Sequence, residues 1–414
     1  MKVWHITKLL HGGSGQYALR LHRALLQRGV DSNLLLLEGE EPPSIYQLQK
    51  TAGLVDRAAT KLLRGISHRV SSAPYHSLLM RERYRSPIPI RDLDIVHLHG
   101  LTGWMGLAGL QDLLPPRALI FWTLHDLWPV SGGCVVYRGC DKFKEGCAHC
   151  PVLRAGLKPW ALLELQLKER FVRGRAIRPL ANSRWTAATI ATSRVFSGAS
   201  DVPVIPPIVD GTYSVGPRQI LRRELGISAS AKVISVGARA VTDEFKGIHM
   251  FLRALSEWSR AKTSVEILLF GEGQVGSIEG LRIHPLGRVD DARRMASIYR
   301  ASDLYVSPSL METFGMSVAE AQACGTAVAG FAVGGVMEAL WEGDASNFVP
   351  VQDFEALFTV IDRVLARSPD ASNVAAARAA WVASRFSAIV VGAAQEAIYA
   401  AASNSAHPTT IDHL

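Results

Sequence analysis

The feature that most constrains the fold of this chain is an alternation of strand-like and helix-like segments that starts twice. Near the N-terminus, the apolar run Lys2–Thr7 is followed by HGGSG and then by Gln16–Arg28, whose leucines recur at helical spacing. Later apolar runs, separated by helix-length segments, form two series: residues 33–37, 94–99 and 118–124, then residues 232–236, 265–270, 304–307 and 327–331. This alternation predicts parallel sheets covered by helices on both faces.

A proline-rich stretch separates the two series. Prolines 203, 206, 207 and 217 interrupt regular structure near residues 200–216. The 414 residues are also enough for two domains. The sequence therefore predicts an α/β protein with two doubly wound, Rossmann-like domains that face a central cleft, with ligands at the carboxyl ends of the strands. We assign residues 1–205 to the first domain, 206–385 to the second, and 386–414 to a C-terminal helix and tail.

Basic residues are concentrated in the first half of the chain. Residues 1–199 contain 27 Lys and Arg against 14 Asp and Glu, a net +13, whereas residues 200–414 contain 18 against 23, a net −5. The excess gathers at Arg81, Arg83 and Arg85, and again between Lys168 and Arg178. Such patches suit phospholipid head groups, a polyprenyl diphosphate or nucleic acid. Solvated helix faces explain the charge equally well.

Composition and the N-terminus bear on the class of protein. A chain with 48% hydrophobic and 20% charged residues is not disordered, collagen-like or a coiled coil. The first strand-like run leads directly into glycines, without the long apolar region of a secretory signal. The best late candidate for a membrane span, Phe386 to Ala402, includes Gln395 and Glu396. We expect a cytoplasmic protein without a transmembrane helix.

Two short segments could bind phosphate. Gly12, Gly13 and Gly15 lie where a strand passes into a helix, so backbone N–H groups can approach an anion there. Their spacing fits neither the dinucleotide fingerprint nor the Walker lysine pattern, and a plain tight turn is an equal alternative. Arg239 and Lys246 follow a predicted strand and could together neutralise a diphosphate, or could be ordinary solvated loop residues.

Other polar residues lie at the ends of predicted strands. Glu312 is in a loop after residue 307, Gly315 permits the turn, and Glu320 falls near the first turn of a helix predicted over 317–324. Both carboxylates could accept hydrogen bonds from sugar hydroxyls, or could merely favour a helix N-terminus. His125, followed by Asp126, ends another strand and could bind a substrate hydroxyl or have a structural role.

Four of the five cysteines are crowded into a loop over residues 134–150. Cys134, Cys140, Cys147 and Cys150 end in a C-x-x-C pair. In a cytoplasmic protein this crowding favours a closed structural zinc site over disulfides, with free or redox-active thiols as the alternative. Cys324, on a predicted helix, is expected to be a buried apolar residue.

Taken together, these motifs resemble family 4 of the retaining glycosyltransferases, whose two-domain architecture is called GT-B. Glu312 and Glu320, with Phe314 and Gly315 after the first acid, are the most diagnostic part. The block TLHDLWPVSGGC with its following cysteines resembles a subgroup that builds bacterial exopolysaccharides and colanic-acid-type repeat units. Further matches are GGSG, VIPPIVD, GARAVTDEFKG, FGEG, LGRVDD and the run over residues 299–335.

The resemblance implies how a donor diphosphate is bound. Gly12, Gly13 and Gly15 would approach the diphosphate of a nucleotide sugar, and Arg239 and Lys246 would neutralise it as it leaves. The family commonly closes the lysine motif as EKG, whereas this chain reads DEFKG.

The resemblance also implies how the nucleoside and the sugar are bound. Glu320 would hold the ribose, and Glu312 would contact hydroxyls of the transferred sugar. Phe314 and Gly315 would offer backbone N–H groups, and His125 would bind the sugar beside its anomeric carbon.

The implied activity is retaining transfer of a hexose from a UDP- or GDP-sugar to a saccharide or polyprenyl-diphosphate-linked acceptor in bacterial polysaccharide biosynthesis. The departing phosphate would accept the proton of the acceptor in a front-side attack. Because Arg and Lys stabilise the leaving group, we expect no catalytic metal, and zinc only in a structural role.

The basic first half would attach the protein peripherally to the inner face of the cytoplasmic membrane, an attachment that salt weakens. We expect no nucleic-acid partner. The alternatives are a sugar-nucleotide epimerase of the same architecture, a zinc-containing nucleic-acid-binding protein and a catalytically silent scaffold.

Overall fold

Two compact units make up the protein. The computed structural model describes residues 1–38, 44–71, 75–92, 94–136, 139–199, 201–259, 265–279, 281–366 and 372–406. Unit 1 comprises Met1–Pro206 together with Val391–Leu414, and unit 2 comprises Pro207–Val390. The chain therefore leaves unit 1 within the proline-rich stretch. The C-terminal segment that the sequence analysis sets apart as 386–414 is shared, because from Val391 onward it belongs to unit 1.

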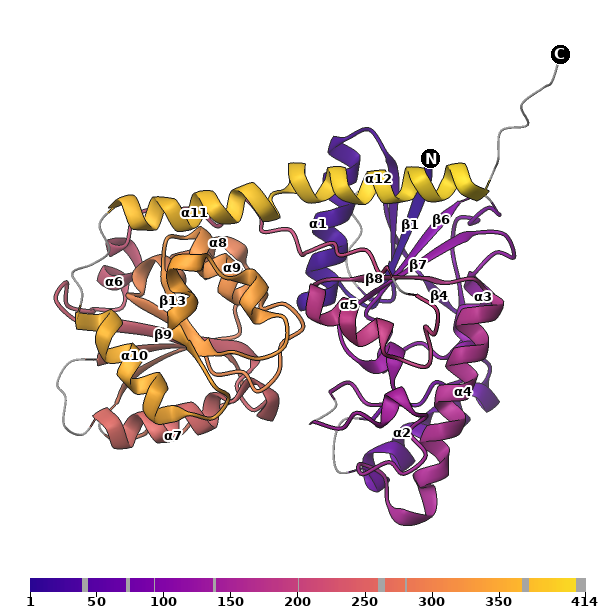
Figure 1. Ribbon diagram of the computed structural model, residues 1–414, viewed down its shortest axis with the longest axis horizontal. Helices are drawn as coiled ribbons and strands as arrows, with labels where there is room; N and C mark the ends of the chain where they lie inside the picture. Colours follow the sequence, from indigo (N-terminus) through magenta and orange to yellow (C-terminus); the bar gives the residue numbers. More distant parts are fainter. Residues whose placement is uncertain are drawn as a thin grey trace. The chain divides into compact units, whose positions relative to one another are not determined.

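Unit 1 is built on a six-stranded parallel sheet with the order β3-β2-β1-β6-β7-β8 (Figure 1). Its strands are β1 (Lys2–Thr7), β2 (Asp31–Leu36), β3 (Ile45–Gln47), β6 (Ile95–His99), β7 (Leu119–Leu124) and β8 (Arg178–Ala181). A short antiparallel ribbon joins β4 (Gln49–Lys50) to β5 (Tyr84–Arg85). The strand order reverses between β1 and β6, and such a switch point leaves a crevice at the carboxyl ends of the strands.

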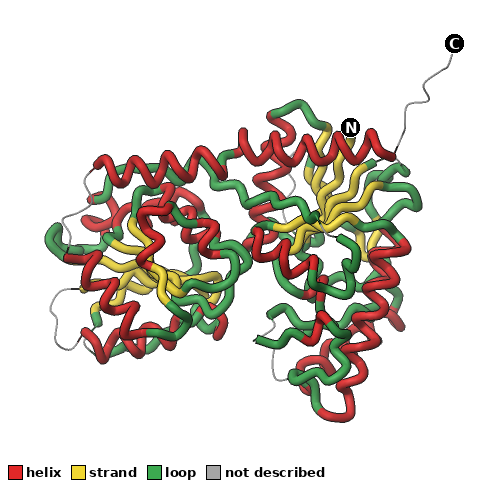
Figure 2. The backbone as a smooth tube through the Cα atoms, viewed as in Figure 1, coloured by secondary structure: helices red, strands yellow, loops and turns green. Residues whose placement is uncertain are grey.

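Helices flank the sheet of unit 1 (Figure 2). They are α1 (Gly13–Gln27), α2 (Leu54–Val70), α3 (Leu107–Leu113), α4 (Lys158–Gly174), α5 (Arg184–Ala191) and most of α12 (Ala388–Ala406). In α1, Ala18, Leu21 and Leu25 recur on one helical face and are all buried. This burial explains why the segment packs as a helix directly after the glycine turn.

Unit 2 repeats the architecture with the strand order β11-β10-β9-β12-β13-β14, and all neighbouring strands are parallel. The strands are β9 (Lys232–Ala240), β10 (Val265–Glu272), β11 (Arg282–Gly287), β12 (Leu304–Ser307), β13 (Ala327–Phe331) and β14 (Phe348–Val349). The helices are α6 (Gln219–Glu224), α7 (Ile248–Ser259), α8 (Ala292–Ala301), α9 (Met316–Ala323), α10 (Phe354–Ala366) and α11 (Ser372–Phe386). Here the strand order reverses between β9 and β12.

The predicted α/β class with two Rossmann-like sheets is confirmed. Every strand run named in the sequence analysis corresponds to a strand of the structure. Six further strands were missed: β3, β4, β5, β8, β11 and β14. They are short, or interrupted by Pro179 and Pro285, and therefore lack a continuous apolar run.

The C-terminal helices meet the length and hydropathy criteria for a membrane span. An 18-residue window within Asn373–Ser405 has a mean hydropathy of 1.4, and 22% of that window is buried, so this stretch is the candidate span in the described part of the chain. Several of its side chains are nevertheless buried within the units: Val382 and Phe386 in unit 2, and Val391 and Tyr399 in unit 1. These four side chains pack against protein.

One of the basic clusters is not a surface patch throughout. Lys168 is almost completely buried, and its Nζ donates hydrogen bonds of 2.6 Å to the carbonyl oxygens of Trp128 and Ser131. Arg175 donates to the carbonyl oxygens of Leu114 and Pro115. These two cations bind the chain's own backbone, so only the remainder of this cluster is available to an anionic partner.

Candidate functional site

In unit 2, the predicted polar residues lie on the two loops that flank the switch point. Lys246 ends a 3₁₀ turn, Glu244–Lys246, in the loop after β9, and Glu312 lies in the loop after β12. The carboxyl ends of β9 and β12 meet at this edge because the two strands are parallel neighbours. The topology thus brings together side chains that are 66 positions apart in sequence.

Lys246 and Glu312 form a direct ion pair. Lys246 Nζ lies 2.6 Å from Glu312 Oε1, and the same oxygen accepts a hydrogen bond of 2.9 Å from Ser309 Oγ. Burial alone would lower the pKa of Lys246, but the Glu312 carboxylate outweighs it and raises that pKa. Lys246 therefore stays charged at neutral pH, with its ammonium group beside the Glu312 side chain.

Close backbone packing fixes this pair. A Cβ on Gly247 would lie 2.1 Å from the carbonyl oxygen of Pro308, and a Cβ on Gly334 would lie 1.9 Å from that of Glu312. Both glycines have positive φ angles. The N–H of Leu310 donates to the carbonyl oxygen of Phe245, which joins the two loops directly. The FKG and GG sequences are therefore needed for loop contact.

Glu320 lies deeper than the sequence analysis expected. It is in the second turn of α9, not the first, and is 6% exposed. No acidic residue occupies the first turn, so the helix-dipole explanation does not apply to it. Burial, with smaller contributions from the carboxylates of Glu312 and Glu320, raises the pKa of Tyr305. Both acids therefore lie within electrostatic reach of one ring.

Three further predicted residues lie at this edge of the unit 2 sheet: Arg239, Phe314 and Gly315. Arg239 lies near the end of β9 and is exposed, with no ion pair among the described residues. Gly315 has φ 95° and begins α9, where a Cβ would lie 2.9 Å from Val336. The Phe314 ring is buried against Phe386, so its side chain is not available to a ligand.

The three glycines of the unit 1 turn have different structural requirements. Gly12 precedes α1 with φ 81°, and a Cβ on Gly15 would lie 2.1 Å from the carbonyl oxygen of Leu9. Gly13 is exposed, and a Cβ there would meet nothing within 4 Å. Packing explains Gly15 and backbone conformation explains Gly12. Neither packing nor backbone conformation explains a glycine at position 13, which leaves the close approach of a ligand as the explanation there.

His125 follows β7 and is half-buried at the same edge of unit 1. Burial lowers its pKa to about 3, so the ring is neutral at physiological pH. Its Nε2 lies 3.2 Å from Nδ1 of His99, and its ring packs edge-on against Tyr17 with a centroid distance of 4.7 Å. A neutral imidazole of this kind can donate one hydrogen bond and accept another.

The sequence analysis missed three further histidines that lie close to His125 or to one another in unit 1. His5 lies on β1, and His97 and His99 lie on β6; all three are fully buried. Their ring nitrogens form a group within 4.8 Å of one another. The signal in the sequence was the alternation H-x-H within an otherwise apolar strand, which places both rings on one face of the sheet.

Asp126 has an internal role. Its two carboxylate oxygens accept hydrogen bonds from Thr102 Oγ1 and from the N–H of Trp128, at 2.8 and 2.9 Å. Burial raises the pKa of Asp126, whereas these hydrogen bonds and the nearby Lys168 favour the charged form. The residue therefore holds the loop after β7, as expected of an acid that caps a turn.

The four clustered cysteines are brought near one another without closing a four-ligand site. Cys134 and Cys150 share a hydrogen bond, which lowers the pKa of Cys150 to about 6. Burial raises the pKa of Cys147 to about 11. In the described part of the chain, no three cysteine sulfurs lie within 4.8 Å of one another. The thiols have the chemistry for zinc, but a four-ligand site requires their sulfur atoms to lie closer together.

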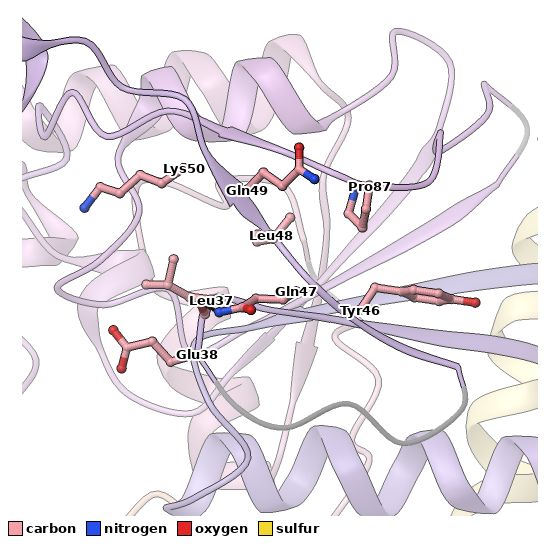
Figure 3. A pocket seen from close by; sticks show the side chains of 8 residues that line it. All are labelled: Leu37, Glu38, Tyr46, Gln47, Leu48, Gln49, Lys50 and Pro87. Atoms are coloured by element: carbon pink, nitrogen blue, oxygen red, sulfur yellow. Dashed lines mark hydrogen bonds between the residues drawn. The ribbon is translucent and has the colours of Figure 1, made fainter.

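A pocket of ≈ 690 Å³ lies in unit 1, beside the ends of β2 and β3 (Figure 3). It is lined by Leu37, Glu38, Tyr46, Gln47, Leu48, Gln49, Lys50 and Pro87. Figure 3 shows Glu38 and Lys50 on one side of the strand and the Tyr46 ring on the other, so these polar groups do not converge. Catalytic pockets have convergent polar groups, and this one does not.

Comparison with known proteins identifies two family models along the chain. The model described as "Glycosyltransferase Family 4" matches residues 11–212, and the model described as "Glycosyl transferases group 1" matches residues 230–367. Each match covers most of one unit. The loops that hold Lys246, Glu312 and His125 all lie within the matched residues.

Curated relatives have related names. A D-inositol 3-phosphate glycosyltransferase of Segniliparus rotundus is 35% identical over 172 residues, which is 38% of this chain and 38% of that protein. A D-inositol 3-phosphate glycosyltransferase of Pseudarthrobacter chlorophenolicus is 25% identical to this chain. The match covers 84% of this chain and 82% of that protein. A phosphatidyl-myo-inositol mannosyltransferase of Mycolicibacterium smegmatis is 36% identical over 29% of this chain and 33% of its own. The match to the first of these spans well under two thirds of that relative's length.

Solved structures share the fold at low identity. Sucrose-phosphate synthase from Thermosynechococcus elongatus matches with a TM-score of 0.68 and 18% identity, over 98% of this chain and 99% of its own. HepE of Anabaena, determined in complex with UDP-glucose, matches with a TM-score of 0.62 and 17% identity, over 97% and 100%. These likenesses concern the fold alone.

Proposed function

Because the chain belongs to the family 4 glycosyltransferases, which have the GT-B fold, we propose that it is a retaining enzyme that transfers a hexose from a nucleotide-diphosphate sugar. The acceptor in this proposal is a saccharide or lipid-linked saccharide of bacterial polysaccharide biosynthesis. The proposal assigns nucleoside, diphosphate and sugar contacts to residues of unit 2, and phosphate and sugar contacts to residues of unit 1.

The observation that carries the proposal is the Lys246–Glu312 pair at the switch point of unit 2. A diphosphate leaving group gains negative charge as its bond to the sugar breaks, and preorganised cations stabilise that charge. Lys246 supplies one cation there and the exposed Arg239 supplies a second. Glu312 accepts hydrogen bonds from sugar hydroxyls, and the departing phosphate takes the acceptor's proton. Glu320 accepts from the ribose.

In unit 1, the proposal assigns phosphate contact to Gly13 and sugar contact to His125. Gly13 is exposed at the start of α1, so its backbone N–H can approach an anion closely. His125 is neutral and therefore adds no charge beside the reacting carbon. Gly12 and Gly15 shape the turn on which Gly13 lies.

The donor is tested by thermal unfolding with UDP, GDP, ADP and their sugar conjugates. A ligand that binds only the folded protein raises the melting temperature by mass action. We expect one nucleotide to raise it in the wild type but not in Glu320→Ala or Arg239→Ala. Arg293→Ala, which removes an exposed arginine of α8, is the matched control. No rise with any nucleotide, together with salt-dependent binding of nucleic acid, would contradict the proposal.

The names of the relatives suggest a second acceptor class. They act on an inositol phosphate or a phosphatidylinositol by name, and the basic first half of this chain suits a phosphorylated acceptor. Transfer from the radiolabelled donor is measured with inositol phosphate and with polyprenyl-diphosphate saccharides. Exclusive transfer to the first would replace the polysaccharide acceptor and leave the donor chemistry intact.

We also propose that α2 attaches unit 1 to an anionic membrane surface. Leu54, Val55 and Leu62 are 79%, 76% and 65% exposed, and Arg57 and Lys61 lie on the same helix. The segment with Arg81, Arg83 and Arg85 runs beside it, since the N–H of Arg81 donates to Thr60 and Arg83 pairs with Asp56. Exposed apolar groups bordered by cations suit an anionic bilayer at the inner face of the cytoplasmic membrane.

Co-sedimentation with phosphatidylglycerol vesicles tests this attachment. We expect binding that falls with salt and with Leu54→Ser/Leu62→Ser. Ile389→Ser, which removes an equally exposed apolar residue from α12, is the control. Equal binding of both variants would remove α2 from the proposal.

A structural zinc at the cysteine loop remains a proposal as well. Cys134, Cys140, Cys147 and Cys150 would hold it, and four thiolates would leave no open position for catalysis. We expect one zinc per chain by elemental analysis, lost in Cys150→Ser and kept in Cys324→Ser. Metal-free protein of full stability would support free thiols.

A further inference from the structure

A row of buried histidines in unit 1 leads to His125. Helix-covered parallel sheets are normally apolar on both faces. Here His5 on β1 and His99 on β6 have no exposed surface. Buried polar groups are tolerated where hydrogen bonds satisfy them. The row ends at the residue to which the proposed function assigns sugar binding.

Two contacts between ring nitrogens join three imidazoles in series. His5 Nδ1 lies 3.0 Å from His99 Nε2, and His99 Nδ1 lies 3.2 Å from His125 Nε2. We call these three residues the histidine relay. His97 lies beside the relay but outside it, because its Nδ1 contacts Tyr399 Oη and its Nε2 contacts Thr123 Oγ1.

All three rings of the relay are neutral. Burial lowers the pKa of His5, His99 and His125 below the ordinary value of histidine. A neutral imidazole has one N–H and one lone pair. In such a series the position of one proton fixes the others. Either each ring donates toward His125, or each donates toward His5.

The far end of the relay distinguishes these two arrangements. His5 Nε2 is buried and has no hydrogen-bond partner among the described residues. Donation toward His5 would place an N–H on this atom, whereas donation toward His125 leaves only a lone pair there. Orphaned buried N–H groups are rarer than under-satisfied acceptors. The favoured arrangement puts the proton of His125 on Nδ1.

We propose that His99, backed by His5, is a positioning residue that holds neutral His125 in the tautomer protonated on Nδ1. His125 then donates a hydrogen bond to an oxygen of the bound sugar and does not act as a base. This inference rests on the proposed function. Positive charge develops on the sugar ring during glycosyl transfer, and a neutral donor binds the sugar without repelling that charge.

Nuclear magnetic resonance tests the tautomer without substrate. Long-range ¹H–¹⁵N correlation spectra of protein labelled with ¹⁵N-histidine distinguish protonated from unprotonated ring nitrogens, and His125→Gln assigns the signals. Among the described residues, the titratable side chains found near His125 are His97, His99 and Tyr17 from the packed elements, with Asp126 beside it in sequence. We expect Nδ1 of His125 to stay protonated, without titration, between pH 5.5 and 8. A proton on Nε2, or titration in that range, would overturn the proposal.

Kinetics tests the positioning role. His99→Phe keeps the volume of the ring but removes its nitrogens, and we expect it to lower kcat by about 10–100-fold with little change in the KM of the donor. His99→Asn places an amide near the position of Nδ1 and should restore most of the rate. His22→Asn, at a buried histidine of α1 outside the relay, should leave the His125 spectrum unchanged.

The two measurements separate the inference from the proposed function. If His125 has the expected tautomer but His99→Phe retains the wild-type kcat, the positioning role is wrong while the transferase proposal stands. If no donor is turned over by the wild type, the proposed function fails, and the spectrum still decides the tautomer.

Discussion

The two units have the same topology but opposite chemistry at their switch points. In unit 2, the edge carries the charged pair Lys246–Glu312, whose loops are locked by glycines in close backbone contact. In unit 1, the equivalent edge has neutral imidazoles that reach back into the sheet. The same fold thus provides either fixed charge or fixed hydrogen-bond direction, depending on which side chains follow the strands.

The largest expected effect that separates the units is acid unfolding of unit 1. His22 and His125 have pKa values of about 4 and about 3, and the pKa values of His5, His97 and His99 also lie well below 6.5. Between those values and 6.5 the unfolded chain binds more protons, so stability falls as pH falls, by about 1.4 kcal/mol per pH unit and histidine. By pH 5 the sum rivals the whole stability of a domain.

Limited proteolysis between pH 7 and 4.5, with mapping of the cuts, measures this difference. Unit 1 should be cleaved first, because no described histidine of unit 2 is buried. Simultaneous cleavage of both units would show that the histidine layer does not set acid sensitivity.

The next effect concerns the charged pair of unit 2. Lys246→Met should lower kcat by about 10²–10³-fold, because it removes a cation that the proposed function assigns to the leaving diphosphate. Glu312→Gln should reduce the rate less, and the double variant should lose less than the product of the two. Initial rates with the donor identified by thermal unfolding give these values, with Arg293→Met as the control. A wild-type rate for Lys246→Met would place the diphosphate elsewhere.

Two glycines of the unit 1 turn, Gly13 and Gly15, are expected to give smaller effects that differ in kind, one on donor binding and the other on stability. Gly15→Ala should lower the free energy of unfolding by about 1–3 kcal/mol, since its Cβ would collide with the carbonyl of Leu9. Gly13→Ala meets open space and should keep full stability, yet weaken donor binding. Chemical denaturation and ligand titration distinguish the two. If both variants bind the donor normally, the turn has no part in binding.

The smallest effect tests how firmly Glu312 is held. Ser309→Ala removes one hydrogen bond of 2.9 Å to Oε1, a change of about 1 kcal/mol that corresponds to a fewfold loss of kcat. Ser297→Ala, which removes a hydroxyl bonded to the carbonyl of Arg293, is the control. A loss as large as that of Lys246→Met would give Ser309 a direct role.

Local sequence was sufficient to predict the central strands of both sheets and the loops that hold the charged residues of unit 2. Apolar runs predicted the central strands, and their ends located Lys246 and Glu312 on the correct loops. The contact between these two side chains could not be predicted, because it depends on how the order of strands reverses between β9 and β12.

The grouping of the buried histidines His5, His97 and His99 could not be predicted from the sequence for a related reason. H-x-H in β6 predicts that two rings share a face, but the register of His5 opposite His97 follows only from the pairing of β1 with β6. Burial also separated residues that composition treats alike: Lys168 is internal, whereas Arg57 and Lys61 on α2 are at the surface.

The return of the chain to unit 1 has a consequence for biosynthesis. Tyr399 of α12 contacts His97 in the core of unit 1, so that core lacks a side chain until α12 has been made. The residues of unit 2 that precede α12, up to residue 387, leave the ribosome before α12 does. We therefore expect unit 2 to complete its folding during translation, while unit 1, although begun first, finishes last.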